Sequence, residues 1–176
     1  LSTIGLVTDE LIALDARLCK DEALAAAGVD RVRLAREAAA RYAALHAKNG
    51  ASYPAINAAT LHLLAGDRAR AEQLAERALH QAHRETSADP LDPLDRYWQA
   101  ATAAEAALVL GRTDEARDLL ATARQANPGD HAALASTRKQ LALVCAARGV
   151  DPELIEVLRP PSVVHFAGHM IGDRFH

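Results

Sequence analysis

Two histidines near the end of the sequence have a spacing that metal ligands often use. His165 and His169 are four residues apart, with Asp173 and His176 close behind them, and imidazole is a common zinc ligand. Two ligands four residues apart converge on one side of a helix, whereas the residues here are β-branched and aromatic and predict a strand followed by a loop. The spacing therefore does not support a metal site, and we expect neither a metal nor another cofactor.

The two cysteines are the candidate nucleophiles. Cys19 and Cys145 both lie in alanine- and leucine-rich stretches that predict helices, where a thiol is ordinarily buried and inert. An activated nucleophile needs a nearby base and a third group that orients the base. The nine glycines are dispersed at predicted helix ends and form none of the usual phosphate-binding loops. We therefore expect no enzymatic activity.

The composition indicates how the elements that carry these side chains pack together. Half of the 176 residues are hydrophobic, 41 are alanine and only 3% are aromatic. Alanine has the highest helix propensity, and the residues that strands favour are sparse before residue 162. We expect an all-α protein whose helices approach one another closely through small side chains.

Charge and hydropathy exclude several classes of partner. The formal net charge is -3, without the basic excess that nucleic-acid-binding surfaces show. The sequence has no apolar run of about 18 residues and no secretory leader, and its two distant cysteines fit a reducing compartment. We expect a cytoplasmic protein that binds neither nucleic acid nor a membrane. Because the sequence begins with Leu1 rather than Met, we also expect an earlier segment to have been removed or to lie outside it.

The sequence repeats itself. In two places a glycine is followed by a small or apolar residue five, nine and twelve positions later. These are Ala71, Ala75 and Ala78 after Gly66, and Ala116, Leu120 and Ala123 after Gly111. A third copy is expected to end at Gly149. The first two glycines are 45 residues apart, about 11 more than one tetratricopeptide repeat, and we assign the excess to a loop over residues 85–95, which contains Pro90 and Pro93.

Capping residues, glycines and prolines predict eight helices and one strand. A stripe of Leu11, Leu14, Leu18 and Ala25 marks the apolar side of the first helix, and Asp30 is expected to cap the second. The helices are expected at residues 8–26, 31–48, 54–65, 67–83, 95–110, 113–126, 131–148 and 152–158, and the strand at 162–166. Residues 1–159 are expected to form the helical domain, and residues 160–176 a tail or the start of a truncated α/β domain.

The glycine and alanine positions, with Pro128 where the second copy closes, resemble the tetratricopeptide repeat over roughly residues 52–149. The tetratricopeptide repeat usually has aromatic residues in its first and second helices. Here these positions hold His62 and Ala75 in one copy and Ala107 and Leu120 in the other. A longer stretch resembles the helical-repeat region of the TRAFs-binding domain, found in stress-activated MAP kinase kinase kinases and in bacterial proteins. The matching segments are residues 14–21 (LDARLCKD), 53–60 (YPAINAAT), 159–161 (RPP) and 166–171 (FAGHMI). These resemblances imply an α-α solenoid that acts as a scaffold, and the alanine- and arginine-rich composition suggests a bacterial origin.

In such a solenoid the first helix of each pair lines the concave face, where residues not needed for packing can contact a ligand. The candidates are Tyr53, Ile56, Asn57 and Thr60 from one repeat, Trp98, Thr102 and Glu105 from the next, and Ser136 and Lys139 from the third. Trp98 is either an interaction anchor or a plug that, with Tyr97, fills the gap between two repeats. Lysine and asparagine clamps for a C-terminal carboxylate are not expected, because Ile56 and Ala101 occupy the matching positions.

The expected function is a non-enzymatic scaffold or regulatory module that binds a peptide or protein on its concave face. The alternative is a structural arm of a larger enzyme or nucleotide-sensing protein whose α/β domain begins near Ser162, with a ligand-binding loop after Phe166. Self-association through the solenoid ends is a third possibility, because the last predicted helix is apolar and solenoid ends need polar caps. The apolar residues in question are Leu154, Ile155, Val157 and Leu158.

Overall fold

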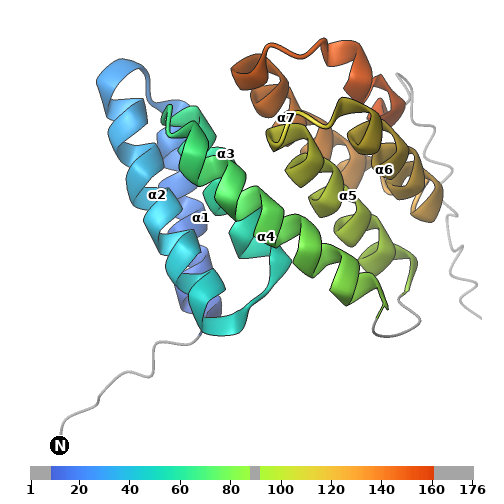
Figure 1. The fold of residues 1–176 in the computed structure, drawn as a ribbon, viewed down its shortest axis with the longest axis horizontal. Coiled ribbons are helices and arrows are strands. Elements are labelled where there is room, and N and C mark those ends of the chain that lie inside the picture. Colours follow the sequence, from blue (N-terminus) through green and yellow to red (C-terminus); the bar gives the residue numbers. More distant parts are fainter. Residues whose placement is uncertain (1–8, 88–91, 161–176) are drawn as a thin grey trace, which may run out of the picture.

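The computed structural model describes residues 9–87 and 92–160, and this part of the chain is all-α, as expected (Figure 1). It contains seven α-helices, one short 3-10 helix and no strand. The elements are α1 (Asp9–Ala25), α2 (Gly28–Asn49), α3 (Ser52–Leu64), α4 (Arg68–Ser87), α5 (Pro93–Val109), α6 (Thr113–Ala126), α7 (His131–Arg148) and η1 (Pro152–Leu158). The expected strand at 162–166 and the tail from 161 onward lie outside the described residues.

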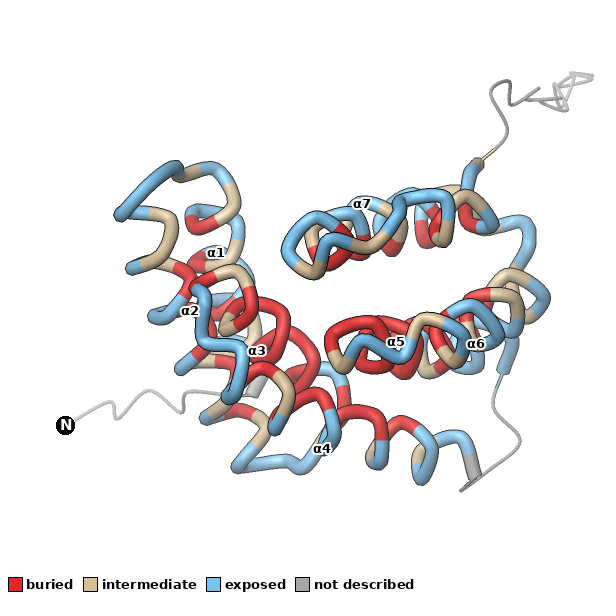
Figure 2. The backbone as a smooth tube through the Cα atoms, turned by 45° about the horizontal axis from the view of Figure 1, so that its top comes forward, coloured by how far each residue is buried: buried red, intermediate tan, exposed pale blue. Residues whose placement is uncertain are grey.

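The helices from α1 to α6 pack mainly on their neighbours in sequence. The helices form the pairs α1 with α2, α3 with α4 and α5 with α6, and α7 packs on η1. The pairs are joined through α2 with α3 and α4 with α5, while α3, α5 and α7 contact one another. The buried residues are concentrated on α3 and α5 (Figure 2), whose many alanines allow neighbouring helices to approach closely.

The two clearest repeat glycines end their helices in the same way. Gly66 after α3 and Gly111 after α5 have φ of 81° and 80°, a left-handed conformation that glycine adopts without steric cost. In both places the residue after the glycine donates its N–H to a carbonyl five residues earlier, at 2.9 Å. This is the Schellman arrangement that closes a helix. Gly149, after α7, also has a positive φ of 68°.

Three expected elements agree with the structure at both ends, namely α6, α7 and η1. Two boundaries were predicted wrongly around the inserted loop. α4 runs on to Ser87 instead of ending near His83, because Glu85 continues the helix and accepts hydrogen bonds from the N–H and hydroxyl of Ser52. α5 begins at Pro93, because Asp92 caps it by accepting two backbone N–H groups at 2.8 Å each.

The start of α2 and the apolar side of α1 also differ from expectation. α2 begins at Gly28 and its N-cap is Ala27, which makes no side-chain hydrogen bond, so Asp30 is within the first turn instead of capping it. The predicted leucine stripe of α1 is more than half exposed, at 54%, 51% and 55% for Leu11, Leu14 and Leu18. The buried side of α1 consists instead of small residues, which let α1 lie close to α2: Ala16, Cys19 and Ala23.

The C-terminal element η1 covers the end of the described chain. Ile155 and Leu158 are buried, whereas Val157 is 39% exposed. Part of the apolar surface expected at this end therefore packs inward, against α6 and α7. None of the described helices is both long and apolar enough to cross a membrane.

Candidate binding site

A groove of about 950 Å³ opens among the first helices of the successive pairs. α3 and α5 form its floor, and α1 and α7 stand on either side (Figure 2). Five acidic and three basic side chains line it, so its surface carries charges of both signs. A cavity of this size accommodates a small ligand or a few residues of a peptide.

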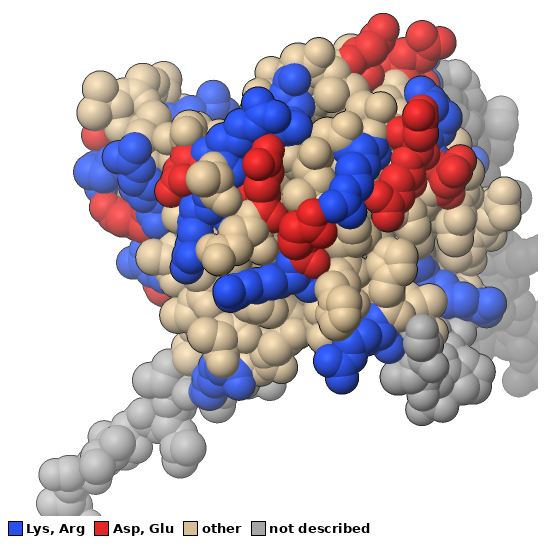
Figure 3. Space-filling model, in the orientation of Figure 1, with Lys and Arg blue, Asp and Glu red and all other residues tan. Residues whose placement is uncertain are grey.

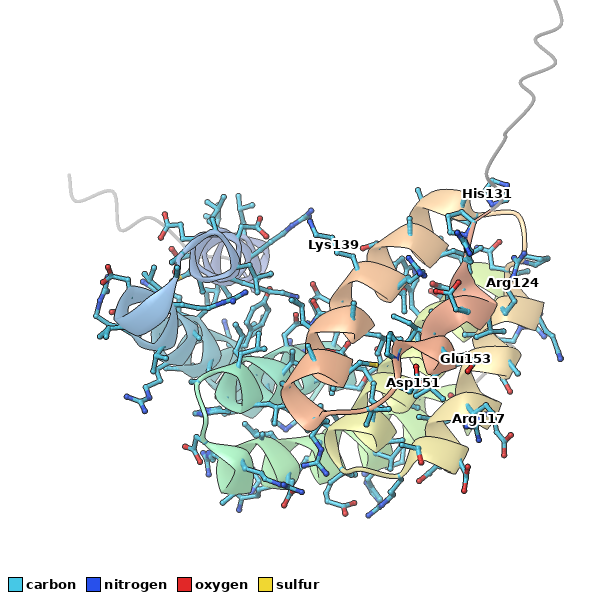
Figure 4. All side chains as sticks on the ribbon, turned by 90° about the horizontal axis from the view of Figure 1, so that it is seen from above. Arg117, Arg124, His131, Lys139, Asp151 and Glu153 are labelled. Carbon is cyan, nitrogen blue, oxygen red and sulfur yellow. The ribbon has the colours of Figure 1, made fainter. Side chains whose placement is uncertain are left out.

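Eight of the nine residues predicted for the concave face line this groove. They are Tyr53, Ile56, Asn57, Trp98, Thr102, Glu105, Ser136 and Lys139. Lys139 lies on the side of α7 that faces α1 (Figure 4), and Ser136 lies nearby on the same helix. The ninth residue, Thr60, is beneath the floor with 1% of its surface exposed, and its hydroxyl donates to Glu105 Oε1 at 2.5 Å. The structure thus brings all nine together.

Two aromatic side chains stand at equivalent positions of the two repeats. Tyr53 and Trp98 are 45 residues apart, as the two repeat glycines are, and they are 54% and 42% exposed. The alternative role of a plug falls to Tyr97, which is completely buried and donates its hydroxyl hydrogen to Thr137 Oγ1 at 2.7 Å. Trp98 meets the ring of Tyr97 edge-on at 5.0 Å. It lines the groove while its neighbour fills the interior.

Glu105 places a carboxylate in the floor of the groove. Its side chain is on α5, and the residue is only 8% exposed. Its Oε1 atom accepts the hydroxyl of Thr60 from α3 and the amide of Gln140 from α7, at 2.5 and 2.8 Å. Burial raises the pKa of Glu105, and the nearby charge of Lys20 and the two hydrogen bonds oppose that rise. The carboxylate therefore joins three helices at an electrostatic cost.

Lys20 brings a cation to the other side of the groove. It projects from α1 and donates to Asn57 Oδ1 at 2.6 Å, while the Asn57 amide donates to the carbonyl of Tyr53 at 2.9 Å. Burial lowers the pKa of Lys20, while Glu105 and Asp21 act in the opposite direction. No ion pair joins Lys20 to Glu105 among the described residues, so their charges influence each other across a gap.

Two other acids of the groove are engaged at helix ends. Glu85 accepts from the N–H and hydroxyl of Ser52 at 3.0 and 2.5 Å, which satisfies the N-terminus of α3. Asp130 accepts the N–H of Ala133 at 2.9 Å and caps α7. These carboxylates hold the walls in place, and neither is buried as Glu105 is.

Sequence reasoning missed Lys20 and Gln140. Lys20 is on α1, which precedes the recognisable repeats, and the only signal was its neighbourhood in the segment that resembles the TRAFs-binding domain. Gln140 follows the predicted Lys139, and one residue along a helix changes direction by about 100°, so the exact register of α7 decided which of the two reaches Glu105.

The cysteines and histidines play no part in this groove within the described chain. Cys19 and Cys145 are both buried and free, and burial raises the pKa of each thiol, although Arg41, whose Nη1 lies 2.8 Å from Cys19 Sγ, opposes the rise at Cys19. Over residues 9–87 and 92–160, no group of three or more histidine, cysteine, aspartate or glutamate side chains could hold a metal ion. His165 and His169 lie outside the described residues.

Comparisons with known proteins give no further guide to the groove: no protein-family model, no curated protein and no solved structure matches the chain.

Proposed function

We propose that this chain is a non-enzymatic scaffold of the tetratricopeptide-like type, which binds an extended segment of a partner protein in the groove. The observation that carries the proposal is the groove itself. Its floor and walls come from the corresponding faces of consecutive helix pairs. Its exposed aromatics, Tyr53 and Trp98, occupy the same repeat position. Helical-repeat proteins use such surfaces to bind peptides.

The chemistry of the lining supports a peptide as the ligand. Exposed tyrosine and tryptophan are the residues most enriched at interaction hot spots, and the polar lining offers both donors and acceptors to a peptide backbone. Basic and acidic side chains are mixed over the face seen in Figure 3. A polyphosphate backbone would need a continuous basic surface, so a protein segment fits better than a nucleic acid.

The test compares two tryptophan substitutions on α7. Ser136 is exposed and lines the groove, whereas the neighbouring Ala135 is exposed and does not line it. A displayed library of random twelve-residue peptides is selected on the wild-type protein, and each enriched peptide is titrated against wild type, Ser136→Trp and Ala135→Trp. We expect Ser136→Trp to weaken binding at least about tenfold by filling the groove, and Ala135→Trp to leave the Kd unchanged. Peptide titration of wild type should also shift the emission of Trp98, its single tryptophan.

Either of two results would contradict the proposal. One is the absence of any enriched peptide, and the other is a set of peptides that both variants bind as tightly as wild type. Circular dichroism of the two variants checks that each retains its helical content, so that loss of binding is not loss of fold.

A further inference from the structure

One oxygen of Glu105, a residue that lines the groove, has no hydrogen-bond partner among the described residues. Both hydrogen bonds that Glu105 accepts from other described residues end on Oε1. Glu105 lines the groove. Its Oε2 atom is not one of the solvent-inaccessible polar atoms that lack a partner, so it is accessible from the groove. A carboxylate offers about four lone-pair sites, so Oε2 has the capacity to accept hydrogen bonds from a ligand.

The charge around this oxygen is incompletely balanced. Lys20, whose charge acts on Glu105, is directed at Asn57 Oδ1, and no ion pair joins it to Glu105 in the described part of the chain. Burial keeps the pKa of Glu105 raised in spite of Lys20, Thr60 and Gln140. A buried anion that is not fully compensated is stabilised by any cation able to reach it.

We propose that the floor of the groove is a pocket for a lysine side chain of the bound segment, whose ammonium group donates to Glu105 Oε2. This inference rests on the proposed function and names the residue type that the groove selects. The partner segment lies along the exposed rim at Tyr53 and Trp98, and its lysine extends downward to the floor.

The geometry favours lysine over the other cations of a peptide. An arginine guanidinium binds a carboxylate best through two parallel hydrogen bonds to both oxygens, but Oε1 already accepts Thr60 and Gln140. An ammonium is a point charge that one oxygen can serve. An N-terminal amine is attached directly to the backbone, and at 8% exposure Glu105 is too deep for the backbone of a segment on the rim to reach.

The experiment uses the peptides enriched on wild type and three proteins. Glu105→Gln removes the charge and keeps an oxygen that can accept from Thr60 and Gln140. Glu153→Gln is the matched control, because Glu153 is an exposed glutamate outside the groove. We expect the enriched peptides to share a lysine. Replacing it by Nε-acetyl-lysine or norleucine should weaken binding to wild type at least about tenfold, the value of a hydrogen bond to a charged group.

The same replacements should change binding to Glu105→Gln by less than about twofold, and Glu153→Gln should behave as wild type. Replacing the lysine by arginine tests for a guanidinium site, and acetylating the peptide N-terminus tests for an amine site. The inference is overturned if arginine restores full affinity, if N-terminal acetylation causes the loss, or if the enriched peptides carry no common lysine. If the enriched peptides carry no common lysine but Ser136→Trp abolishes their binding, the lysine inference fails and the proposed function still stands. If no peptide is enriched at all, both are overturned.

Discussion

At the scale of single residues, Glu105 is the group whose environment has the clearest consequence. It is buried, it links α3, α5 and α7 through Thr60 and Gln140, and Lys20 faces it across the groove. Burial raises its pKa in the folded protein. A carboxyl whose folded pKa lies above its unfolded pKa binds its proton more tightly when folded, so stability falls as the pH rises between the two values.

We therefore predict a specific pH dependence for the stability difference between wild type and Glu105→Gln. Relative to the variant, wild type should lose about 1.4 kcal/mol for each pH unit between the ordinary carboxyl pKa and the raised one. The difference should be constant below and above this window. Urea unfolding of both proteins at a series of pH values measures it, and subtraction cancels the groups that the two share. A difference that does not vary with pH, or that grows in favour of wild type, would contradict the prediction.

The sequence was informative about which residues meet in the groove and less so about how they interact. The nine concave-face candidates followed from the repeat register, because positions 45 residues apart in the first two copies, and 38 apart between the second and third, are expected to face the same way in equivalent helices. The hydrogen bond from Thr60 to Glu105 joins two such positions, but no local pattern reveals it. Lys20 was missed because α1 has no repeat signature, and its contact with Asn57 depends on how α1 packs in three dimensions.

At the scale of helices, boundaries were predictable where local signals act alone and wrong where a tertiary contact intervenes. Asp130 and Asp151 cap the starts of α7 and η1, Gly149 ends α7, and α6 lies between Gly111 and Pro128; the limits of all three agree with expectation. α4 extends past the predicted end because Glu85 bonds to Ser52, 33 residues away. On α1 the leucine stripe predicted the wrong buried side. The small residues on another side of the helix are buried instead, because they allow α1 to approach α2 more closely.

This contact between α4 and α3 yields a prediction about element stability. Glu85→Ala removes both acceptors from Ser52 and leaves the buried N-terminus of α3 without its cap. We expect the free energy of unfolding to fall by about 1–2 kcal/mol, as measured by chemical denaturation. Arg77→Ala, at an exposed position of the same helix, is the control and should change stability by less than about 0.5 kcal/mol. Equal effects of the two variants would show that Glu85 does not cap α3.

At the scale of the whole molecule, α7 is held at several points along its length, which fixes the far wall of the groove. Thr137 and Gln140 bond to Tyr97 and Glu105 of α5. At the other end, Arg148 reaches Glu72 of α4 at 3.0 Å, although the two are 76 residues apart. The Arg148 side chain is only 9% exposed and passes over Gly111, where an added Cβ would collide with its guanidinium.

The two equivalent repeat glycines therefore differ in what an alanine would cost. Gly66 and Gly111 share a positive φ near 80°, so Gly66→Ala and Gly111→Ala should both lose about 1–2 kcal/mol of stability from backbone strain. A Cβ at Gly66 meets nothing within 4 Å. At Gly111 it must displace Arg148 from Glu72, so Gly111→Ala should be the more destabilising of the two substitutions. Chemical denaturation of the two variants measures the difference.

A double-mutant cycle separates the two contributions. In an Arg148→Ala background the collision and the ion pair are both absent, so the two glycine substitutions should cost the same within about 0.5 kcal/mol. An excess cost at Gly111 that persists without Arg148 would locate the constraint in the backbone of the turn after α5. Disappearance of the excess would show that Arg148 fastens α7 to α4, and that the far wall of the groove depends on the glycine that follows α5.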